Sequence, residues 1–481
     1  MAKQYDFQLY RDGQWVDSSS GKTDTIYSPA DGSVVGTVPV AAAADATRAL
    51  ESARRAQRAW GRRPAIERAR LLHAFCAEIR ANAEELAQLI VREQGKLLKV
   101  ARFEVEVTCS FMEYAASWAR QLEGDIVPSD NPDEQLLIHR VPRGVVVAIT
   151  AWNFPLALAG RKIGPALVTG NAVVVKPTPA APLSTLALCD LAKRAGLPDG
   201  ILNMVTGDVE AGVALTESPL TNMITMTGGT PTGQAIARSA AKHLTHVQLE
   251  LGGKAPCIVF EDADLDQAVA GALHSRFDNH GQVCTCNERM YVHEDIYEAF
   301  MDKFRAAVRG LKVGDPAAED TDIGPLTDAA TITNIERLIR AGVAAGAKIT
   351  IGGEALREGD YASGNWFPPT LIEDVTQDMD MVHEELFGPV LPVLKFRDYD
   401  EVIAQANDCK YGLAAMVFTR DLGRVMRLPH DLEFGEIYIN RGHGELHQGF
   451  HNGLKLSGTG GEDGRYGLEQ YLEKKTTYLK Y

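Results

Sequence analysis

Two cysteines one residue apart, Cys284 and Cys286, stand in the stretch NHGQVCTCNER and offer the chain a candidate nucleophile. A thiolate outperforms any hydroxyl at neutral pH once the thiol pKa is lowered. Spacing alone leaves a buried structural cysteine as the commoner case. A Cys-x-Cys pair is narrower than the usual zinc spacing and has no further ligands nearby, so no metal site is predicted. A disulfide between such close neighbours would be strained.

A carboxylate and an amide in two other stretches suit carbonyl chemistry. Glu250 lies in LELGGKAP between apolar neighbours. Partial burial there would raise its pKa toward the range of a general base. Asn153 lies in TAWNFP after an apolar run, where open α/β sheets bind ligands, and its amide can donate to a developing oxyanion. Each residue alone also fits a structural role, as a solvated glutamate or a turn asparagine before proline.

The elements that must position these groups show two α/β patterns. Strand-like runs GVVVAIT, NAVVVK, ILNMVTG and NMITMTG alternate with helix-like segments from residue 143 onward. Strands apolar on both faces predict a parallel sheet covered by helices. The alternation resumes after Asp262, with RMYVHE, AAMVFT and FGEIYIN as strands, and predicts a second domain. Residues 41–119 show helical periodicity, with one helix starting near Pro64.

Two polar, extended stretches lie outside both patterns. They are LEGDIVPSDNPDEQLLIHR and the final LEQYLEKKTTYLKY. We predict that they pair with each other and form subunit contacts.

Composition narrows the classes of partner and compartment. The 481 residues carry 64 acidic and 49 basic side chains, a net charge of −15, which disfavours nucleic acid and anionic membranes. Seven scattered cysteines are no disulfide framework. No signal peptide and no apolar run of the ~20 residues that cross a bilayer is recognisable. We therefore expect a cytoplasmic protein that binds neither nucleic acid nor membrane.

Five motifs in order, TAWNFP, ELGGKAP, GQVC, EELFGPV and KLSGTGGEDG, resemble the NAD(P)-dependent aldehyde dehydrogenases over residues 7–481. GQVCTCNER, GEIYINR and HQGFHNGLKLSG are similar to the lactaldehyde and glycolaldehyde dehydrogenases of that family. The resemblance implies an aldehyde dehydrogenase-like α/β fold. It places a dinucleotide-binding domain in residues 1–123 and 143–249 and a catalytic domain in residues 250–445. Residues 124–142 and 446–481 become oligomerisation or bridging arms of a homo-oligomer, a dimer or a tetramer.

The resemblance also implies roles for the reactive groups. Cys284 attacks the aldehyde to give a thiohemiacetal, and Asn153 holds its oxyanion. Glu250 activates the water that hydrolyses the later thioester. Lys162 assists proton relay and touches the cofactor ribose. Cys286 is expected to line the pocket. A Cys-His hydrolase using His280 is discounted, because hydrolysis alone needs no dinucleotide domain.

The cofactor is expected to be NAD or NADP. Lys176, in VVVKPTPAAP, is similar to the lysine that hydrogen-bonds the adenosine ribose. Pro179 stands where many NAD-preferring members carry an acidic residue that repels the 2′-phosphate of NADP. The sequence therefore predicts that NADP is accepted. Further cofactor-binding positions implied by the resemblance are Thr150, Trp152, Thr178, Gly207, Thr227, Gly228, Gly229, Gly233, Leu251, Glu385 and Phe387.

Three positions match substrate residues of the lactaldehyde-type enzymes: Arg161, Glu445 and His451. A polar pocket of this kind favours a small 2-hydroxyaldehyde, lactaldehyde or glycolaldehyde, because a site that hydrogen-bonds a hydroxyl rejects analogues without one. The loop GHGELH differs from that subfamily. Alternatives are a semialdehyde such as succinic semialdehyde, a broad range of aldehydes, a CoA-acylating dehydrogenase, which Glu250 disfavours, or a non-catalytic protein, which intact Cys284, Glu250 and Asn153 disfavour.

Overall fold

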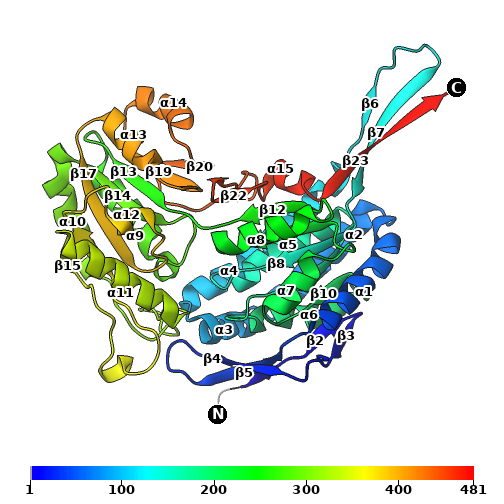
Figure 1. The fold of residues 1–481 in the computed structure, drawn as a ribbon, viewed down its shortest axis with the longest axis horizontal. Helices are drawn as coiled ribbons and strands as arrows, with labels where there is room; N and C mark the ends of the chain where they lie inside the picture. Colours follow the sequence, from blue (N-terminus) through cyan, green and yellow to red (C-terminus); the bar gives the residue numbers. More distant parts are fainter. Residues whose placement is uncertain (1–2) are drawn as a thin grey trace.

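Two large sheets organise the computed structural model, which describes residues 3–481 (Figure 1). The first sheet has the strand order β22-β12-β11-β8-β9-β10-β2-β3. Its five central strands are parallel, and those from β8 to β11 are almost wholly buried on both faces, as their apolar sequences predict. The strands are β8 (Val145–Ile149), β9 (Ala172–Lys176), β10 (Leu202–Met204), β11 (Met223–Thr227), β12 (His246–Glu250) and the antiparallel edges β2 (Leu9–Arg11), β3 (Gln14–Val16) and β22 (Gly458–Thr459).

Helices cover this sheet and extend it toward the N-terminus. The predicted helical region is confirmed as four consecutive helices, of which the second begins directly after Pro64. The helices are α1 (Ala43–Gly61), α2 (Ala65–Ala81), α3 (Ala83–Gln94), α4 (Leu98–Ser117), α5 (Pro155–Val168), α6 (Leu183–Arg194), α7 (Val209–Thr216) and α8 (Thr230–Ala241). A small sheet of β1 (Tyr5–Asp6), β5 (Val34–Pro39) and β4 (Thr23–Tyr27) lies beneath them, and η1 (Trp118–Arg120) follows α4.

The second sheet belongs to the other α/β domain, on the left of Figure 1, and has the order β15-β16-β17-β14-β13-β19-β20. The predicted strands after residue 262 are confirmed as β14, β19 and β20. Its strands are β13 (Ala255–Val259), β14 (Asn287–His293), β15 (Lys348–Ile351), β16 (Thr370–Glu373), β17 (Val390–Phe396), β19 (Ala414–Phe418) and β20 (Glu436–Ile439). Its helices are α9 (Leu265–Phe277), η2 (Asp278–Gly281), η3 (Glu294–Ile296), α10 (Tyr297–Arg309), α11 (Ala329–Ala344), η4 (Gly359–Tyr361), α12 (Asp380–His383), α13 (Tyr399–Asn407) and α14 (Leu422–Asp431).

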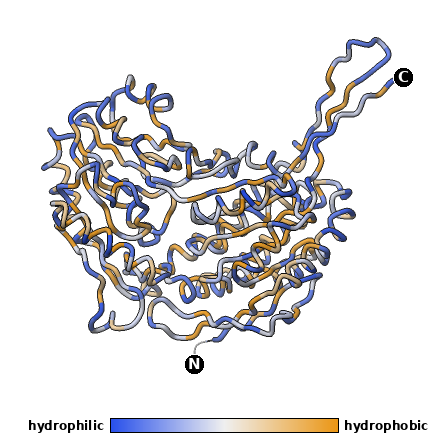
Figure 2. The backbone as a smooth tube through the Cα atoms, viewed as in Figure 1, coloured by the Kyte–Doolittle hydropathy of each residue, from blue (hydrophilic) through white to orange (hydrophobic). Residues whose placement is uncertain are grey.

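A three-stranded arm projects from the body of the molecule (Figure 1). In it, β23 (Leu472–Lys480) pairs antiparallel along the whole of β7 (Glu134–Pro142), and β6 (Asp125–Val127) pairs with the other edge of β7. The predicted pairing of the two polar stretches is thus confirmed. Short hydrophobic stretches are interspersed with hydrophilic ones along the arm (Figure 2). Its role in subunit contact stays a prediction.

Within the predicted oligomerisation or bridging segment 446–481, residues 446–471 lie between the two domains, and β23 alone joins the projecting arm. Between the domains, β21 (Leu454–Lys455) pairs with β18 (Tyr411–Gly412), β22 pairs with β12, and α15 (Gly464–Glu469) leads into the arm. This segment brings its own side chains to the site described below. No helix among residues 3–481 is long and apolar enough to span a membrane.

Candidate active site

The end of β12 and the loop before β14 meet where the two sheets approach each other. Glu250 closes β12, and the next residues pass directly beside Cys284. A Cβ added to Gly253 would lie 2.3 Å from the Cys284 carbonyl oxygen, and one added to Gly252 would lie 2.7 Å from Glu385 Oε2. Gly253 is required because a Cβ there would collide with the Cys284 backbone, whereas a Cβ on Gly252 would displace the Glu385 carboxylate.

Cys284 faces a cavity of about 720 Å³. Burial raises the pKa of the Cys284 thiol, and the neighbouring His451 lowers it in part. Asn153 lines the same cavity, just before α5, and its Nδ2 donates to the Gln282 carbonyl at 3.0 Å. The second amide hydrogen of Asn153 is left for another acceptor. The predicted nucleophile and oxyanion donor therefore share one cavity.

Glu250 is buried and unpaired by hydrogen bonds. Neither carboxylate oxygen has a hydrogen-bond partner among the described residues. Burial raises the pKa of Glu250 to about 8, with the charge of His451 opposing the shift. A carboxyl with such a pKa is suited to accept a proton from water near neutral pH.

His451 is buried next to both Cys284 and Glu250, and its predicted contact with the substrate stays a prediction. Its Nε2 is 3.4 Å from Glu250 Oε2, and its Nδ1 is 2.9 Å from Glu436 Oε2. Burial and Arg161 lower the pKa of His451, but the carboxylates of Glu436 and Glu250 prevail and raise it well above its usual value. A positive imidazole here stabilises a thiolate at Cys284.

Arg161 and Lys162, adjacent on α5, are held by carboxylates of residues 445–463. Arg161 is within 3.3 Å of Glu462 and 3.1 Å of Glu445, and it pairs with Asp463. Lys162 Nζ donates to Thr227 Oγ1 at 2.8 Å and pairs with Glu462. The predicted substrate residues Arg161 and Glu445 both line the cavity, but the arginine is already neutralised.

The predicted cofactor residues lie at the carboxyl ends of β8, β9 and β11. Lys176 ends β9, and burial lowers its pKa to about 8. Its ammonium has no hydrogen bond or ion pair within residues 3–481, and Thr150 Oγ1 is buried without a partner. Buried polar groups without a protein partner fit a ligand that supplies hydroxyl or phosphate oxygens. Pro179 is exposed, three residues beyond Lys176.

The turn between β11 and α8 adds a second part of this site. Gly229 caps α8 in an extended conformation, so the free N–H groups of the first helical turn can bind an anion. A Cβ on Gly233 would lie 2.5 Å from Leu251 Cδ2, which shows how closely α8 approaches β12. Gly228 and Thr227 form the start of this turn, and Gly207 adopts a φ of +121° beside Ala41.

Aromatic rings and a carboxylate complete the predicted nicotinamide end. The rings of Trp152 and Phe387 meet edge to face with centroids 5.3 Å apart. Glu385 Oε1 accepts a hydrogen bond from the Gly253 N–H at 2.9 Å, and burial raises the pKa of Glu385 to about 7. Thr178, half-buried, lies two residues after Lys176.

Two expectations about neighbouring residues have different outcomes. The expectation that Cys286 lines the pocket is wrong, since Cys286 is fully buried and its Sγ points to the Gly281 carbonyl at 3.6 Å. His280 is also fully buried, and its Nδ1 accepts from the Gly324 N–H at 3.0 Å. Burial lowers the pKa of His280 to about 4, so this histidine is a structural residue and no hydrolase base.

The structure adds acidic and imidazole groups that sequence reasoning did not single out. The motif KLSGTGGEDG held Glu462 and Asp463, but only as marks of the family. His443 lies in the loop GHGELH, which was noted only as a departure from the subfamily, and it lines the cavity with His274 and Asp278. Glu436, on β20, stood in the motif GEIYINR, which was likewise only a mark of the family.

Comparison with known proteins identifies the class. Residues 15–477 match the aldehyde dehydrogenase family. The chain is 57% identical to the 3,6-anhydro-alpha-L-galactose dehydrogenase of Vibrio sp. (strain EJY3), covering 99% of both chains. It is 43% identical to the lactaldehyde dehydrogenase of Escherichia coli (strain K12), covering 98% of both. A solved structure of 3,6-anhydro-L-galactose dehydrogenase in complex with NAP, which is NADP, superposes with a TM-score of 0.98 over 99% of this chain and 100% of that one.

The chain therefore belongs to the aldehyde dehydrogenase family. It is an enzyme that oxidises aldehydes with NAD or NADP as its cofactor. The predicted α/β fold is confirmed by the same neighbours.

Proposed function

We propose that the enzyme oxidises a sugar-type 2-hydroxyaldehyde to its carboxylic acid, with 3,6-anhydro-L-galactose as the first substrate to test. The 57% sequence identity over the full length to an enzyme named for that sugar carries this proposal. A cavity of about 720 Å³ supports it, since it is large for the three carbons of lactaldehyde and is in the range of sites for much larger ligands. The proposed substrate has the predicted hydroxyl group beside its carbonyl, but it is larger than the predicted lactaldehyde or glycolaldehyde.

The chemistry begins at Cys284. Its thiolate, favoured by the positive His451, attacks the aldehyde carbon, and the Asn153 amide donates to the oxygen as it becomes negative. A bound NAD or NADP would supply the acceptor for the hydride that leaves the substrate carbon. Cys284 then carries the acyl group as a thioester.

Glu250 completes the reaction by removing a proton from water as the water attacks the thioester. The carboxylic acid leaves, and the Cys284 thiolate is regenerated. Lys162 is fixed between Thr227 and Glu462, where it can orient a cofactor hydroxyl. This scheme makes hydrolysis, and not transfer to CoA, the fate of the acyl group.

NADP is the proposed preferred cofactor. Lys176 supplies an unpaired positive charge, and Pro179 leaves out the acidic side chain that would repel a 2′-phosphate. The similarity to a structure that contains NAP supports the same choice. We further propose a homo-oligomer, dimer or tetramer, formed through the β6–β7–β23 arm.

A semialdehyde is the second candidate, because the chain is 42% identical to the glutarate-semialdehyde dehydrogenase of Pseudomonas aeruginosa (strain ATCC 15692). A substrate carboxylate would need a free cation. Arg161 is matched by Glu445, Glu462 and Asp463, so it offers no excess positive charge. The acidic surroundings of Arg161 favour the uncharged sugar aldehyde.

Absorbance at 340 nm with 3,6-anhydro-L-galactose, L-lactaldehyde and glutaric semialdehyde, each with NAD and NADP, tests these choices. We expect the highest kcat/KM for the anhydro sugar with NADP. A higher kcat/KM for lactaldehyde or the semialdehyde would reject the sugar proposal and leave the chemistry intact.

A further inference from the structure

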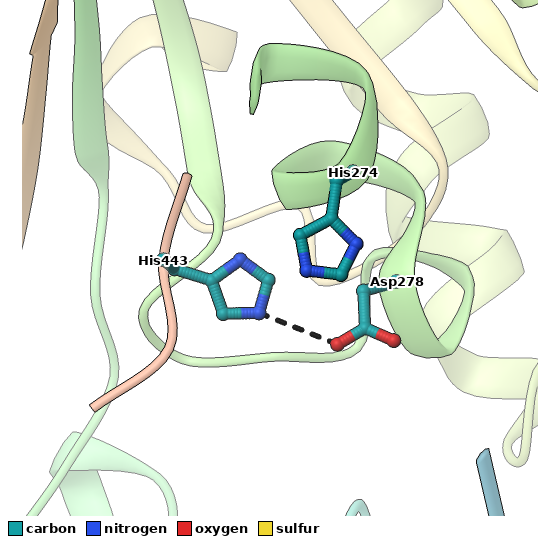
Figure 3. Close-up of side chains that lie close together, drawn as sticks. All are labelled: His274, Asp278 and His443. Carbon is teal, nitrogen blue, oxygen red and sulfur yellow. Dashed lines mark ion pairs between the residues drawn. The ribbon is translucent and has the colours of Figure 1, made fainter. Parts of the chain in front are cut away.

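A cluster of polar side chains, His274, Asp278 and His443, lies on the wall of the cavity that holds Cys284 (Figure 3). His274 comes from the last turn of α9, Asp278 from the start of η2, and His443 from the loop after β20. One ring nitrogen of each histidine and one carboxylate oxygen of Asp278 lie within 4.8 Å of one another. The scheme for aldehyde oxidation uses none of the three.

The cluster interrupts a wall that is otherwise largely apolar. The neighbouring lining residues are Leu97, Val100, Phe103, Ala270, Leu273 and Leu311. In such a cavity, a few converging polar groups fix the orientation of a ligand. The hydrogen-bonding capacity of the cluster is therefore a candidate determinant of substrate choice.

Much of this capacity is unused. His443 Nε2 is 3.3 Å from Asp278 Oδ2, and its Nδ1 is 3.0 Å from Ser275 Oγ. The Asp278 carboxylate has no other partner, and the His274 ring has no hydrogen bond, among residues 3–481. One carboxylate oxygen of Asp278 and both ring nitrogens of the exposed His274 are thus free to bind a ligand.

The charge states suit neutral hydroxyl groups. Burial acts to raise the pKa of Asp278, but the hydrogen bond and charge of His443 prevail and lower it, so the carboxylate is ionised at neutral pH. Burial and the neighbouring His443 lower the pKa of His274, which keeps that ring neutral. An ionised carboxylate accepts from a hydroxyl, and a neutral imidazole both donates and accepts.

The geometry favours an organic ligand over a metal ion. The rings of His274 and His443 stack almost parallel, 5° apart in orientation, with centroids at 5.4 Å. Imidazoles that share one metal must instead point their lone pairs at a common centre. His443 Nε2 also already faces Asp278.

We propose that His274, Asp278 and His443 form a distal subsite that binds hydroxyl groups of a polyhydroxylated aldehyde while its carbonyl carbon is at Cys284. This inference rests on the proposed oxidation of a sugar-type aldehyde and names the residues that recognise its far end. Asp278 accepts a hydrogen bond from one hydroxyl, and His274 donates to a second oxygen. Aldehydes without distal hydroxyls leave these groups unpaired.

The test compares erythrose with 2-hydroxybutanal. Both are four-carbon 2-hydroxyaldehydes, and only erythrose carries distal hydroxyls. We expect wild type to prefer erythrose, and we expect Asp278→Ala to lower kcat/KM for erythrose and for 3,6-anhydro-L-galactose by about tenfold to a hundredfold, the effect of a hydrogen bond to a charged group. For 2-hydroxybutanal the change should stay within about threefold.

Two further variants keep the test sharp. His274→Ala, at an exposed position, should lower kcat/KM for erythrose about threefold to tenfold, the effect of a neutral hydrogen bond. Asp322 lines the same cavity but pairs with Lys99 at 3.6 Å, so Asp322→Ala is the matched control and should leave the preference for erythrose unchanged.

The outcomes separate the two proposals. Equal losses on both four-carbon aldehydes, or no loss on either, would overturn the subsite. Zinc retained by purified wild type and lost in His443→Ala would overturn it in favour of a metal site. A preference for erythrose that Asp278→Ala removes, in an enzyme inactive on the anhydro sugar, would keep the subsite and reject that sugar as the substrate.

Discussion

Two buried glutamates a short distance apart in sequence, Glu250 and Glu288, are in opposite electrostatic environments. Glu288 is 1% exposed and Glu250 is 2% exposed. Glu288 pairs with Lys254 at 2.7 Å and with Arg276 at 3.0 Å. It also accepts hydrogen bonds from the backbone N–H groups of Leu386 and Phe387. Burial acts to raise the pKa of Glu288, yet these partners lower it to about 2.

Glu250 has the same burial without hydrogen-bond partners, and its one ion-pair neighbour in the described chain is His451, 3.4 Å away. Its oxygens accept no hydrogen bond within the described chain, and its pKa rises to about 8. Two lysines repeat the contrast, because Lys254 is paired with Glu288 whereas Lys176 is unpaired beside the cofactor residues. The structural pair Glu288 and Lys254 and the site residues Glu250 and Lys176 are all buried. The two sets differ in whether protein groups hydrogen-bond to the charged atoms.

The sharpest extension of this comparison is to the two cysteines. Cys284→Ala should lower aldehyde oxidation by about 10⁴-fold or more, because the covalent route is lost. Cys286→Ala should keep the rate within about threefold, because its sulfur only fills a buried space. Steady-state absorbance at 340 nm measures both, and fluorescence quenching checks that NADP still binds to Cys284→Ala. A larger loss of oxidation rate in Cys286→Ala than in Cys284→Ala would make Cys286 the nucleophile and Cys284 the structural cysteine.

Glu250→Gln should reduce steady turnover by about 10² to 10⁴-fold, the contribution of a general base. Acylation of Cys284 does not need this carboxylate, so a burst of one NADPH per active site should precede the slow phase. Stopped-flow absorbance resolves the burst. Full steady turnover in this variant would place the base elsewhere.

Glu288→Gln should act on stability, not on the chemical step. Removing one partner of a buried ion network leaves Lys254 and Arg276 uncompensated, which costs about 3 to 5 kcal/mol in the free energy of unfolding. Denaturant titration measures the loss, with Glu250→Gln as the matched control that should lose little or none. Equal losses of unfolding free energy in the two variants would show that the two glutamates do not differ in how their partners stabilise the charge.

The sequence could predict much of the framework because periodic hydrophobicity is local. The buried strands from 145 to 149 and from 172 to 176, and the pairing of the two arm stretches, follow from short patterns of residue type. The motifs also located Cys284, Glu250 and Asn153. Local patterns do not predict the packing between segments that are distant in sequence. For example, the four partners of Glu288 come from three separate stretches.

The wrong placement of Cys286 has a backbone cause. Asn279, His280 and Gly281 all have positive φ, at 42°, 61° and 76°. Three successive residues in this region are rare for side chains other than glycine, and they turn the loop so that the Cys286 sulfur points inward to Gly281. The positions of His451 and of the polar cluster at His443 depend on similar long loops, whose course local sequence does not determine.

Cofactor choice tests the unpaired lysine. Pro179→Glu places an acidic side chain three residues beyond Lys176, where it would repel a 2′-phosphate and bind ribose hydroxyls instead. The ratio of kcat/KM for NADP to that for NAD should fall by about tenfold or more, roughly 1.4 kcal/mol. Pro179→Gln is the uncharged control and should change the ratio much less. An unchanged ratio in Pro179→Glu would remove this position from cofactor recognition.

The pH dependence of stability should show opposite signs for the two glutamates. Glu250 has a raised pKa, so between its unfolded value near 4.5 and about 8 the folded protein holds the extra proton, and stability falls as pH rises. Glu288 has a lowered pKa, so its stabilisation is present above 4.5 and is lost as pH falls toward about 2.

The unfolding free energy of wild type minus that of Glu250→Gln, measured from pH 5 to pH 8, isolates the first effect. This difference should decrease with pH by at most about 1.4 kcal/mol per unit. The same subtraction with Glu288→Gln should be nearly flat in that range, because Glu288 stays ionised in both states. A flat difference for Glu250 would mean that its carboxylate is solvated or hydrogen-bonded in solution. The presence or absence of hydrogen-bond partners would then no longer explain which glutamate is the base.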